Sequence, residues 1–249
     1  MTNHGLQLSQ CNSSLTMFDV VAFDADDTLW FSEDSFRKYE NQFVDVLSPY
    51  VSEGTDIKAA LVATERSNIE AYGYGVKSFG LSAMEAAITL TNGKILASDL
   101  QHILRGVREH LTEPVRVFDG VADVLSRVSS QFRTILITKG DLAHQTRKVE
   151  TSGLSHHFDH VEIVLEKDPT TYSHVLKSLD INPQRFCMVG NSLKSDILPV
   201  LAIGGFGVYV PYEILWELDH AEAPPANTDR FVELPTISQV PEWLVQQRS

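Results

Sequence analysis

The chain has 249 residues, of which 43% are hydrophobic and 21% are charged. This composition supplies enough apolar material for a sizeable core and excludes disorder over most of the chain. The 20 basic and 33 acidic residues leave a net charge of −13. Since no dense run of Lys and Arg is present, binding to a nucleic acid is not expected. The two cysteines, Cys11 and Cys187, are too few for a disulfide scaffold.

The start of the chain has neither the cationic residues nor the apolar stretch of a secretory signal. No apolar run approaches the roughly 18 residues that a membrane span requires. Residues 1–16 are expected to form a flexible leader. These features favour a cytoplasmic protein with no membrane partner, and they leave open whether it is a monomer or a homodimer.

An apolar run at 18–23 predicts a buried strand, and the pattern then changes. Between residues 33 and 112, apolar residues such as Phe36, Phe43 and Leu47 recur at helical spacing. We expect a glycine-rich break at 72–80. The helices expected in this region are 33–48, 55–71, 81–91 and 98–111.

After Pro114 short apolar runs alternate with helical stretches. The expected strands are 133–138, 160–165, 185–190 and 206–210, and the expected helices are 119–129, 141–152, 170–179 and 194–203. This alternation predicts an α/β fold, with a parallel sheet covered by helices on both faces. The first strand must join the same sheet, because alone it leaves its backbone unpaired.

The chain is therefore expected to divide into a core and an insertion. Residues 17–32 and 113–249 would form the core, and residues 33–112 would be an inserted helical unit. The tail at 220–249 is rich in Pro and acidic residues, and we expect it to pack irregularly on the surface.

Polar residues follow the ends of the predicted strands. Ligands of open α/β sheets bind at the carboxyl ends of the strands, so these residues are expected to converge. They are Asp24, Asp26, Thr138, Lys139, Gly140, Lys167, Asn191 and Asp196. The first two are carboxylates two residues apart, which repel each other unless a cation neutralises them or one is protonated. Mg²⁺ with oxygen ligands meets that need.

The segments DADDT, ILITKG, Lys167 and GNSLKSD, in this order, resemble the four motifs of the haloacid dehalogenase superfamily, whose members are mostly phosphatases. The resemblance covers residues 18–32 and 113–215. It implies a Rossmann-like parallel sheet core with an inserted α-helical cap at 33–112.

The resemblance also implies roles for individual residues. Asp24 would be the nucleophile that forms an aspartyl-phosphate, and Asp26 would protonate the leaving oxygen and then activate water. Thr138 and Lys167 would hold the phosphoryl group. Mg²⁺ would bind to Asp24, to the backbone carbonyl of Asp26 and to Asp196.

Some neighbouring positions have less definite roles. Asn191 stands where many relatives have Asp, so its role as a direct metal ligand is open. Lys139 and the amides around Gly140 are candidates for phosphate binding. Tyr72 and Tyr74 lie in the glycine-rich break of the helical region and are candidates for contact with the leaving group.

The second acid favours phosphoester chemistry, because an alkoxide needs a proton to leave and a halide does not. We therefore expect a phosphatase acting on a small phosphorylated metabolite, either a sugar phosphate or a nucleoside monophosphate. The alternatives are a phosphomutase or dehalogenase of the same superfamily, or a non-catalytic protein that binds phosphate esters.

Overall fold

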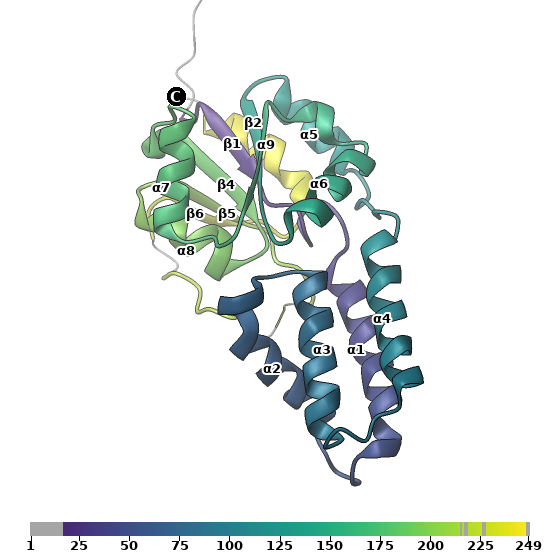
Figure 1. Ribbon diagram of the computed structural model, residues 1–249. Coiled ribbons are helices and arrows are strands. Elements are labelled where there is room, and N and C mark those ends of the chain that lie inside the picture. The colour runs from purple at the N-terminus through teal and green to yellow at the C-terminus, as the bar shows by residue number, and fades with distance from the viewer. Residues whose placement is uncertain (1–16, 215, 217–218, 226–227, 248–249) are drawn as a thin grey trace, which may run out of the picture.

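The structure of the protein is a computed structural model that describes residues 17–214, 216, 219–225 and 228–247. The expected leader at 1–16 lies outside these residues. Within them, six parallel strands form one sheet in the order β3-β2-β1-β4-β5-β6 (Figure 1). The strands are β1 (Val20–Phe23), β2 (Arg133–Lys139), β3 (His160–Val164), β4 (Phe186–Gly190), β5 (Phe206–Tyr209) and β6 (Phe231–Glu233).

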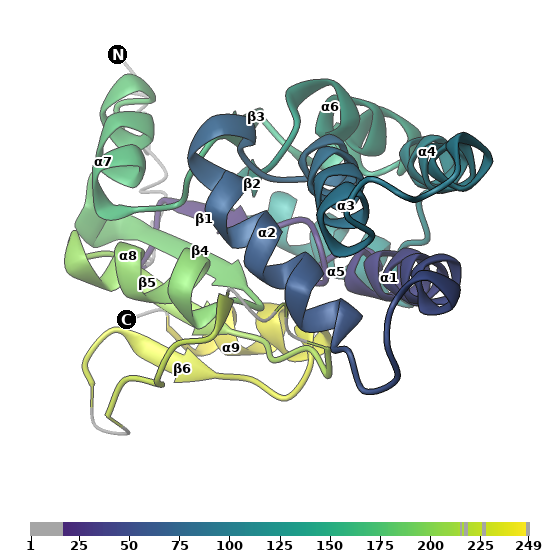
Figure 2. The same ribbon diagram turned by 60° about the horizontal axis from the view of Figure 1, so that its bottom comes forward.

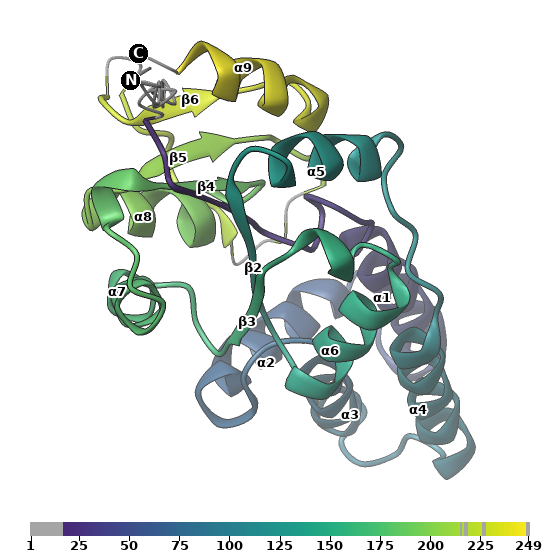
Figure 3. The same ribbon diagram turned by 90° about the horizontal axis from the view of Figure 1, so that it is seen from above.

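Strand β1 is buried on both of its faces. Val21 and Phe23 pack into one apolar cluster, whereas Val20 and Ala22 pack into another on the opposite side of the sheet. A strand of this kind requires helices on both faces. One face is covered by α5 (Val121–Ser129), α6 (Leu142–Thr151) and α9 (Val240–Gln246), and the other by α7 (Pro169–Ser178) and α8 (Leu198–Ala202) (Figure 3).

Four helices between β1 and α5 form the helical insertion. They are α1 (Glu33–Leu47), α2 (Ile57–Tyr72), α3 (Val76–Leu90) and α4 (Ala97–Thr112). They pack around an apolar cluster of their own that includes Phe43, Leu47 and Leu61. Because the chain leaves β1 at its carboxyl end, the insertion lies over that edge of the sheet (Figure 2). Nowhere in the described ranges is a helix both long and apolar enough to cross a membrane.

The break between α2 and α3 is shorter than predicted, because α3 begins at Val76. Only Gly73, Tyr74 and Gly75 separate the two helices. Both glycines have positive φ values, +69° and +100°, a conformation that glycine adopts without steric cost. The sharp turn therefore needs only three residues.

The prediction of an irregular tail was wrong. Strand β6 extends the sheet beside β5, and α9 buries Val240 and Leu244, which are at most 1% exposed. These two residues are four positions apart and so lie on one face of the helix. Pro241 stands in the first turn of α9, where proline is tolerated because its missing N–H has no helical partner.

Leu244→Ala tests whether the tail belongs to the core. Removing a buried leucine side chain leaves a cavity, so we expect the free energy of unfolding to fall by about 2–5 kcal/mol. The neighbouring Val245 is 46% exposed, and Val245→Ala should change the stability by no more than about 0.5 kcal/mol. Urea unfolding measures both variants. Equal stabilities for the two would contradict the assignment of α9 to the core.

Candidate active site

The register of the parallel strands brings distant polar residues to one place. Phe23 of β1 pairs with Leu136 of β2 and with Val189 of β4. Asp24 follows directly, and its N–H donates to the carbonyl of Val189 at 2.9 Å. Most of the residues predicted from the strand ends line one cavity: Asp24, Asp26, Thr138, Lys139, Lys167, Asn191 and Asp196.

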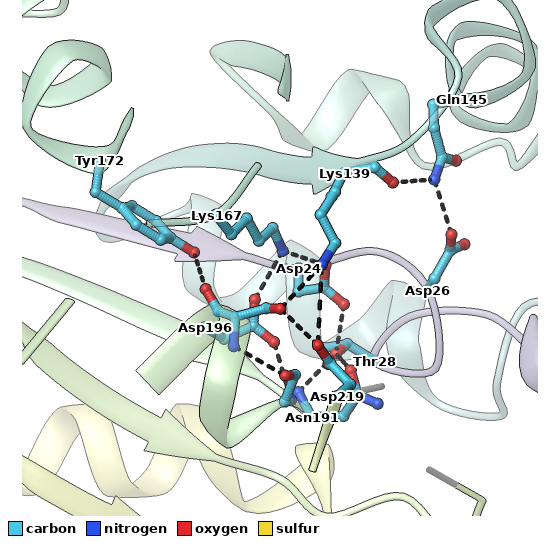
Figure 4. A network of polar contacts seen from close by, with 12 residues as sticks. Asp24, Asp26, Thr28, Lys139, Gln145, Lys167, Tyr172, Asn191, Asp196 and Asp219 are labelled. Atoms are coloured by element: carbon cyan, nitrogen blue, oxygen red, sulfur yellow. Dashed lines mark hydrogen bonds and ion pairs between the residues drawn. The ribbon is translucent and has the colours of Figure 1, made fainter. Parts of the chain in front are cut away.

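Lys167 joins two buried carboxylates. Its Nζ lies 2.5 Å from Asp24 Oδ1 and 2.7 Å from Asp196 Oδ1 (Figure 4). Burial raises the pKa of both carboxyls above the usual range, although Lys167 opposes the shift. Burial alone would lower the pKa of Lys167, but Asp196 and Asp24 outweigh it and hold that pKa well above normal. One ammonium group facing two carboxylates leaves a negative charge that a divalent cation would neutralise.

Asp196 depends on the glycine that ends β4. A Cβ atom at Gly190 would lie 2.3 Å from Asp196 Oδ2. The N–H of Ser192 donates to the same oxygen at 3.0 Å. Asp196 is therefore held against bare backbone, at the π-helical turn Leu193–Ile197 that follows the strand.

Asp26 has a separate set of partners. It accepts hydrogen bonds from Trp30 Nε1 at 2.6 Å and Gln145 Nε2 at 2.8 Å, and it forms an ion pair with Lys148. Burial raises the pKa of Asp26, but Lys148 and the two donors outweigh it, so that the pKa lies below its ordinary value. The second acid is thus ionised and fixed in orientation.

Gln145 and Lys148 were not identified from the sequence. They are three residues apart on α6, the helix that begins shortly after Gly140. Residues at this spacing lie on one helix face. The one sequence signal for these two residues was their position shortly after the segment ILITKG, which ends at Gly140.

Two threonines border Asp24. Thr138 is 1% exposed, and its hydroxyl has no hydrogen-bond partner in the described part of the chain. Thr28, also missed although it stands in DADDT, lies 3.0 Å from Asp24 Oδ2 and 3.2 Å from Asn191 Oδ1. Asn191 is therefore linked to the first carboxylate through Thr28. The unpartnered Thr138 hydroxyl points to a ligand that completes the site.

Lys139 faces a carboxylate that was not selected from the sequence. Its Nζ lies 3.2 Å from Ser195 Oγ and 3.8 Å from Asp219 Oδ1. The hydroxyl of Ser195 donates to Asp219 at 2.8 Å. Asp219 follows β5 in the chain, and no motif or periodicity marks it.

The structure brings only one of the two predicted tyrosines to the cavity. Tyr74 lines it, donates to Glu166 and has the Lys139 ammonium 4.1 Å from its ring centroid. Tyr72 is 46% exposed and is not among the lining residues. Gly140 adjoins the cavity without lining it, and a Cβ atom there would lie 3.2 Å from Gln145 Nε2.

The far side of the cavity is formed by the helical insertion. Its lining residues include three carboxylates, three apolar side chains and a serine: Glu33, Phe36, Glu40, Glu65, Ile69, Ser78 and Phe79. The cavity has a volume of about 160 Å³. Burial, reinforced by the neighbouring Glu40, raises the pKa of Glu33 to about 7. The sequence signal for these glutamates is their spacing, which places them on the same helix faces as Phe36 and Leu61.

The oxygen ligands at the strand ends fit Mg²⁺. No three side chains among His, Cys, Asp and Glu in the described ranges converge closely enough to hold a metal alone. Mg²⁺ is usually bound through one or two carboxylates and keeps several waters. Two carboxylates with a residual negative charge, together with an amide oxygen, match that requirement.

Comparison with known proteins identifies the family. The family model of the haloacid dehalogenase-like hydrolases matches residues 18–204, and the chain belongs to this hydrolase family. A solved haloacid dehalogenase-like family hydrolase from Xanthomonas campestris is 42% identical to this chain. The match covers 96% of this chain and 95% of the Xanthomonas chain, with a TM-score of 0.84.

Curated relatives at lower identity are named as phosphatases. A glyceraldehyde 3-phosphate phosphatase from Methanothermobacter thermautotrophicus is 25% identical over 83% of this chain and 92% of its own length. The human N-acylneuraminate-9-phosphatase is 24% identical over 90% of this chain and 95% of its own length.

Solved structures below 20% identity share the fold alone. They include YfnB from Bacillus subtilis bound to magnesium, at 16% identity and a TM-score of 0.61, covering 91% of this chain and 98% of its own. A 2-haloacid dehalogenase from Pseudomonas syringae has 18% identity and a TM-score of 0.62, and the match covers 92% of this chain and 99% of the dehalogenase.

The buried carboxyl of Glu33 should give the stability a measurable pH dependence. Its pKa is about 7 in the folded protein, against an ordinary value of 4.5, so the folded state retains the proton at higher pH than the unfolded state. Stability is then lost as the pH rises through this window. Glu33→Gln has no proton to lose. Its free energy of unfolding relative to wild type should therefore be on the order of 2 kcal/mol higher at pH 7 than at pH 4.5.

Urea unfolding at a series of pH values tests this expectation. Glu70→Gln, an exposed change on α2, is the matched control and should show no such pH-dependent gain. A difference between wild type and Glu33→Gln that stays constant over this pH range would contradict the assignment.

Proposed function

We propose that the protein is a Mg²⁺-dependent phosphatase that hydrolyses a small phosphomonoester through an aspartyl-phosphate on Asp24. One observation carries the proposal. Asp24, the unpartnered hydroxyl of Thr138 and the ammonium of Lys167 border the same cavity, with a second acid, Asp26, beside them. This combination suits attack on phosphorus, binding of the phosphoryl oxygens and proton transfer.

In the first step, a carboxylate oxygen of Asp24 attacks the phosphorus atom. The new bond joins oxygen to phosphorus, and the bond from phosphorus to the ester oxygen breaks. Asp26 gives its proton to that departing oxygen, which leaves as an alcohol. Thr138 donates a hydrogen bond to the phosphoryl group, and Lys167 balances its charge.

Asp26 must gain a proton before this step. Lys148, Gln145 and Trp30 favour its ionised form. The approach of a negatively charged phosphate opposes them, because a like charge raises the pKa of a carboxyl group. Substrate binding therefore favours the protonated acid, and departure of the alcohol leaves Asp26 ionised.

In the second step, a water molecule attacks the phosphorus of the aspartyl-phosphate. Ionised Asp26 takes a proton from this water, and the bond between phosphorus and Asp24 breaks. Inorganic phosphate leaves, Asp24 is again a free carboxylate, and Asp26 carries the proton with which the first step began.

A bound Mg²⁺ would offset the repulsion between the carboxylate of Asp24 and the anionic phosphate. The groups that would hold it are Asp24, Asp196 and the backbone carbonyl of Asp26, with Asn191 bonded either to the metal or to one of its waters. The N–H of Ser192 and the bare backbone at Gly190 keep Asp196 in place for this role.

A small phosphorylated metabolite suits the shape of the cavity. The helical insertion covers the strand ends (Figure 2). Residues of both the insertion and the strand ends line the cavity that holds the reacting groups. Enclosure of this kind excludes water from a reactive intermediate. The phosphatase names of the curated relatives point to the same substrate class. A sugar phosphate and a nucleoside monophosphate both remain within it.

Asp26 favours this reaction over dehalogenation. Release of halide needs no proton, whereas the three groups that fix Asp26 suit a side chain that transfers one. A phosphomutase is separated by its products, because it returns a phosphorylated sugar and no inorganic phosphate. A non-catalytic protein would bind phosphate esters and release nothing.

The first test is phosphate release from a panel of sugar phosphates, nucleoside monophosphates and p-nitrophenyl phosphate. Release should require Mg²⁺ and stop with chelator. Asp24→Asn should lower kcat by at least about 10³-fold, because the amide is not a nucleophile. Asp45 lies on α1 away from the cavity, and Asp45→Asn is the matched control with unchanged kcat. Full activity of the Asp24→Asn variant would contradict the proposal.

Lys148→Met tests the group that holds Asp26. The variant loses the ion pair that fixes the second acid, so kcat should fall by at least about tenfold, within the range attributed to general acid catalysis. Lys148→Arg keeps the charge and should retain more activity than the methionine variant. Lys177→Met, an exposed change on α7, should behave as wild type. Equal rates for Lys148→Met and wild type would contradict this role for Lys148.

A further inference from the structure

Three carboxylates of the helical insertion face the same cavity as Asp24. Glu33 and Glu40 come from α1, and Glu65 comes from α2. Glu33, Phe36 and Glu40 are spaced by three and four residues, so they occupy one face of α1. All three carboxylates are at most 9% exposed. The mechanism proposed above uses none of them.

The insertion supplies little positive charge on this side. Lys58 Nζ lies 2.6 Å from Glu40 Oε2, and its side chain is 41% exposed. The carboxylate of Glu33 has neither a hydrogen-bond nor an ion-pair partner within the part of the chain that the structure describes. None of the described cavity residues that belong to the insertion is Lys or Arg. Arg37 and Lys58 lower the pKa of Glu33 from a distance, but burial and the neighbouring Glu40 outweigh them.

The ionised form of the Glu33 carboxyl is unfavourable without a partner, because the charge has lost its hydration, and its pKa is accordingly raised to about 7. A cation bound beside Glu33 would supply the missing partner and favour the ionised form. The apolar side chains of Phe36, Ile69 and Phe79 line the same cavity as the carboxylates. Carboxylates beside aromatic rings suit a positively charged nitrogen on a carbon framework, since both attract a cation.

We propose that Glu33, Glu40 and Glu65 bind a cationic nitrogen of the leaving group, so that the substrate is a phosphomonoester that carries an amine. The inference rests on the proposed function, because it places the phosphoryl group at Asp24 and the amine on the insertion side of the same cavity. The two ends of the substrate then carry opposite charges, and each meets its complement.

Two other leaving groups fit less well. A polyhydroxyl group can donate hydrogen bonds to carboxylates, but it leaves their charge uncompensated. A leaving group with a carboxylate of its own is repelled. Both are outcomes that the following experiment distinguishes from an amine.

Matched pairs of esters provide the test. One pair is glucosamine 6-phosphate and glucose 6-phosphate, and the other is 2-aminoethyl phosphate and 2-hydroxyethyl phosphate. Within each pair an ammonium group replaces a hydroxyl. N-acetylglucosamine 6-phosphate keeps the nitrogen and removes its charge. Binding is measured by calorimetry with full-length Asp24→Asn protein and Mg²⁺, and kcat/KM is measured with the wild-type enzyme.

In at least one pair, the amine should bind at least tenfold more tightly than the hydroxyl compound, and N-acetylation should remove the advantage. The ratio should fall below threefold when Glu33→Gln is added. Glu65→Gln is the second variant, in case the first fails to fold. Glu70→Gln, exposed on α2, is the matched control and should keep the full ratio.

Equal affinities within both pairs would overturn the inference. So would undetectable binding of the amines, or a preference that both glutamine variants retain. The binding measurements decide the matter without turnover. If no ester releases phosphate, the proposed function fails, but the affinity ratio still tests the glutamates. If p-nitrophenyl phosphate is hydrolysed and amines have no advantage, only the present inference fails.

Discussion

The ammonium group of Lys167 lies between two carboxylates that come from different strands, Asp24 after β1 and Asp196 after β4. All three groups are buried, and removing one partner of a buried ion pair costs about 3–5 kcal/mol because the other charge is left without compensation. The arrangement therefore requires that β1, β4 and the segment after β3 end at one edge in a fixed register. The parallel sheet provides that register, and the apolar clusters on its two faces hold it. The position of these charges therefore depends on the fold of the core.

The two acids of the first motif have opposite electrostatic surroundings although one residue separates them. Burial raises the pKa of Asp24, whereas Lys148 and two hydrogen-bond donors lower that of Asp26. Pairs of carboxyl groups whose environments separate their pKa values are suited to different roles in one reaction. Both α6 of the core and the turn that contains Trp30 contribute to this difference. The division of roles is thus a property of the tertiary structure and not of the motif alone.

The parallel sheet and the helical insertion could be predicted from the sequence. So could the meeting of most strand-end residues at one cavity. Buried parallel strands are short apolar runs with polar residues after them, and that pattern is visible in one sequence. Gln145, Lys148 and Asp219 could not be found in this way, because their roles come from contacts between elements. Glu33 stands three residues before Phe36 and Glu65 four residues after Leu61, so both lie on the apolar faces of their helices, and this spacing was an unused signal of their burial. Strand β6 has three residues, too few for a periodic pattern.

The glycine that ends β4 shows how a residue without a side chain can constrain a charged site. The carboxylate of Asp196 occupies the space where any other residue at position 190 would place its first carbon. Gly190 offers no group to a substrate, and yet a mutational scan would find position 190 as intolerant as a residue that takes part in the reaction. Inactivation caused by lost space and inactivation caused by lost chemistry look the same in such a scan. For this family member, they can be told apart by whether Asp196 has moved.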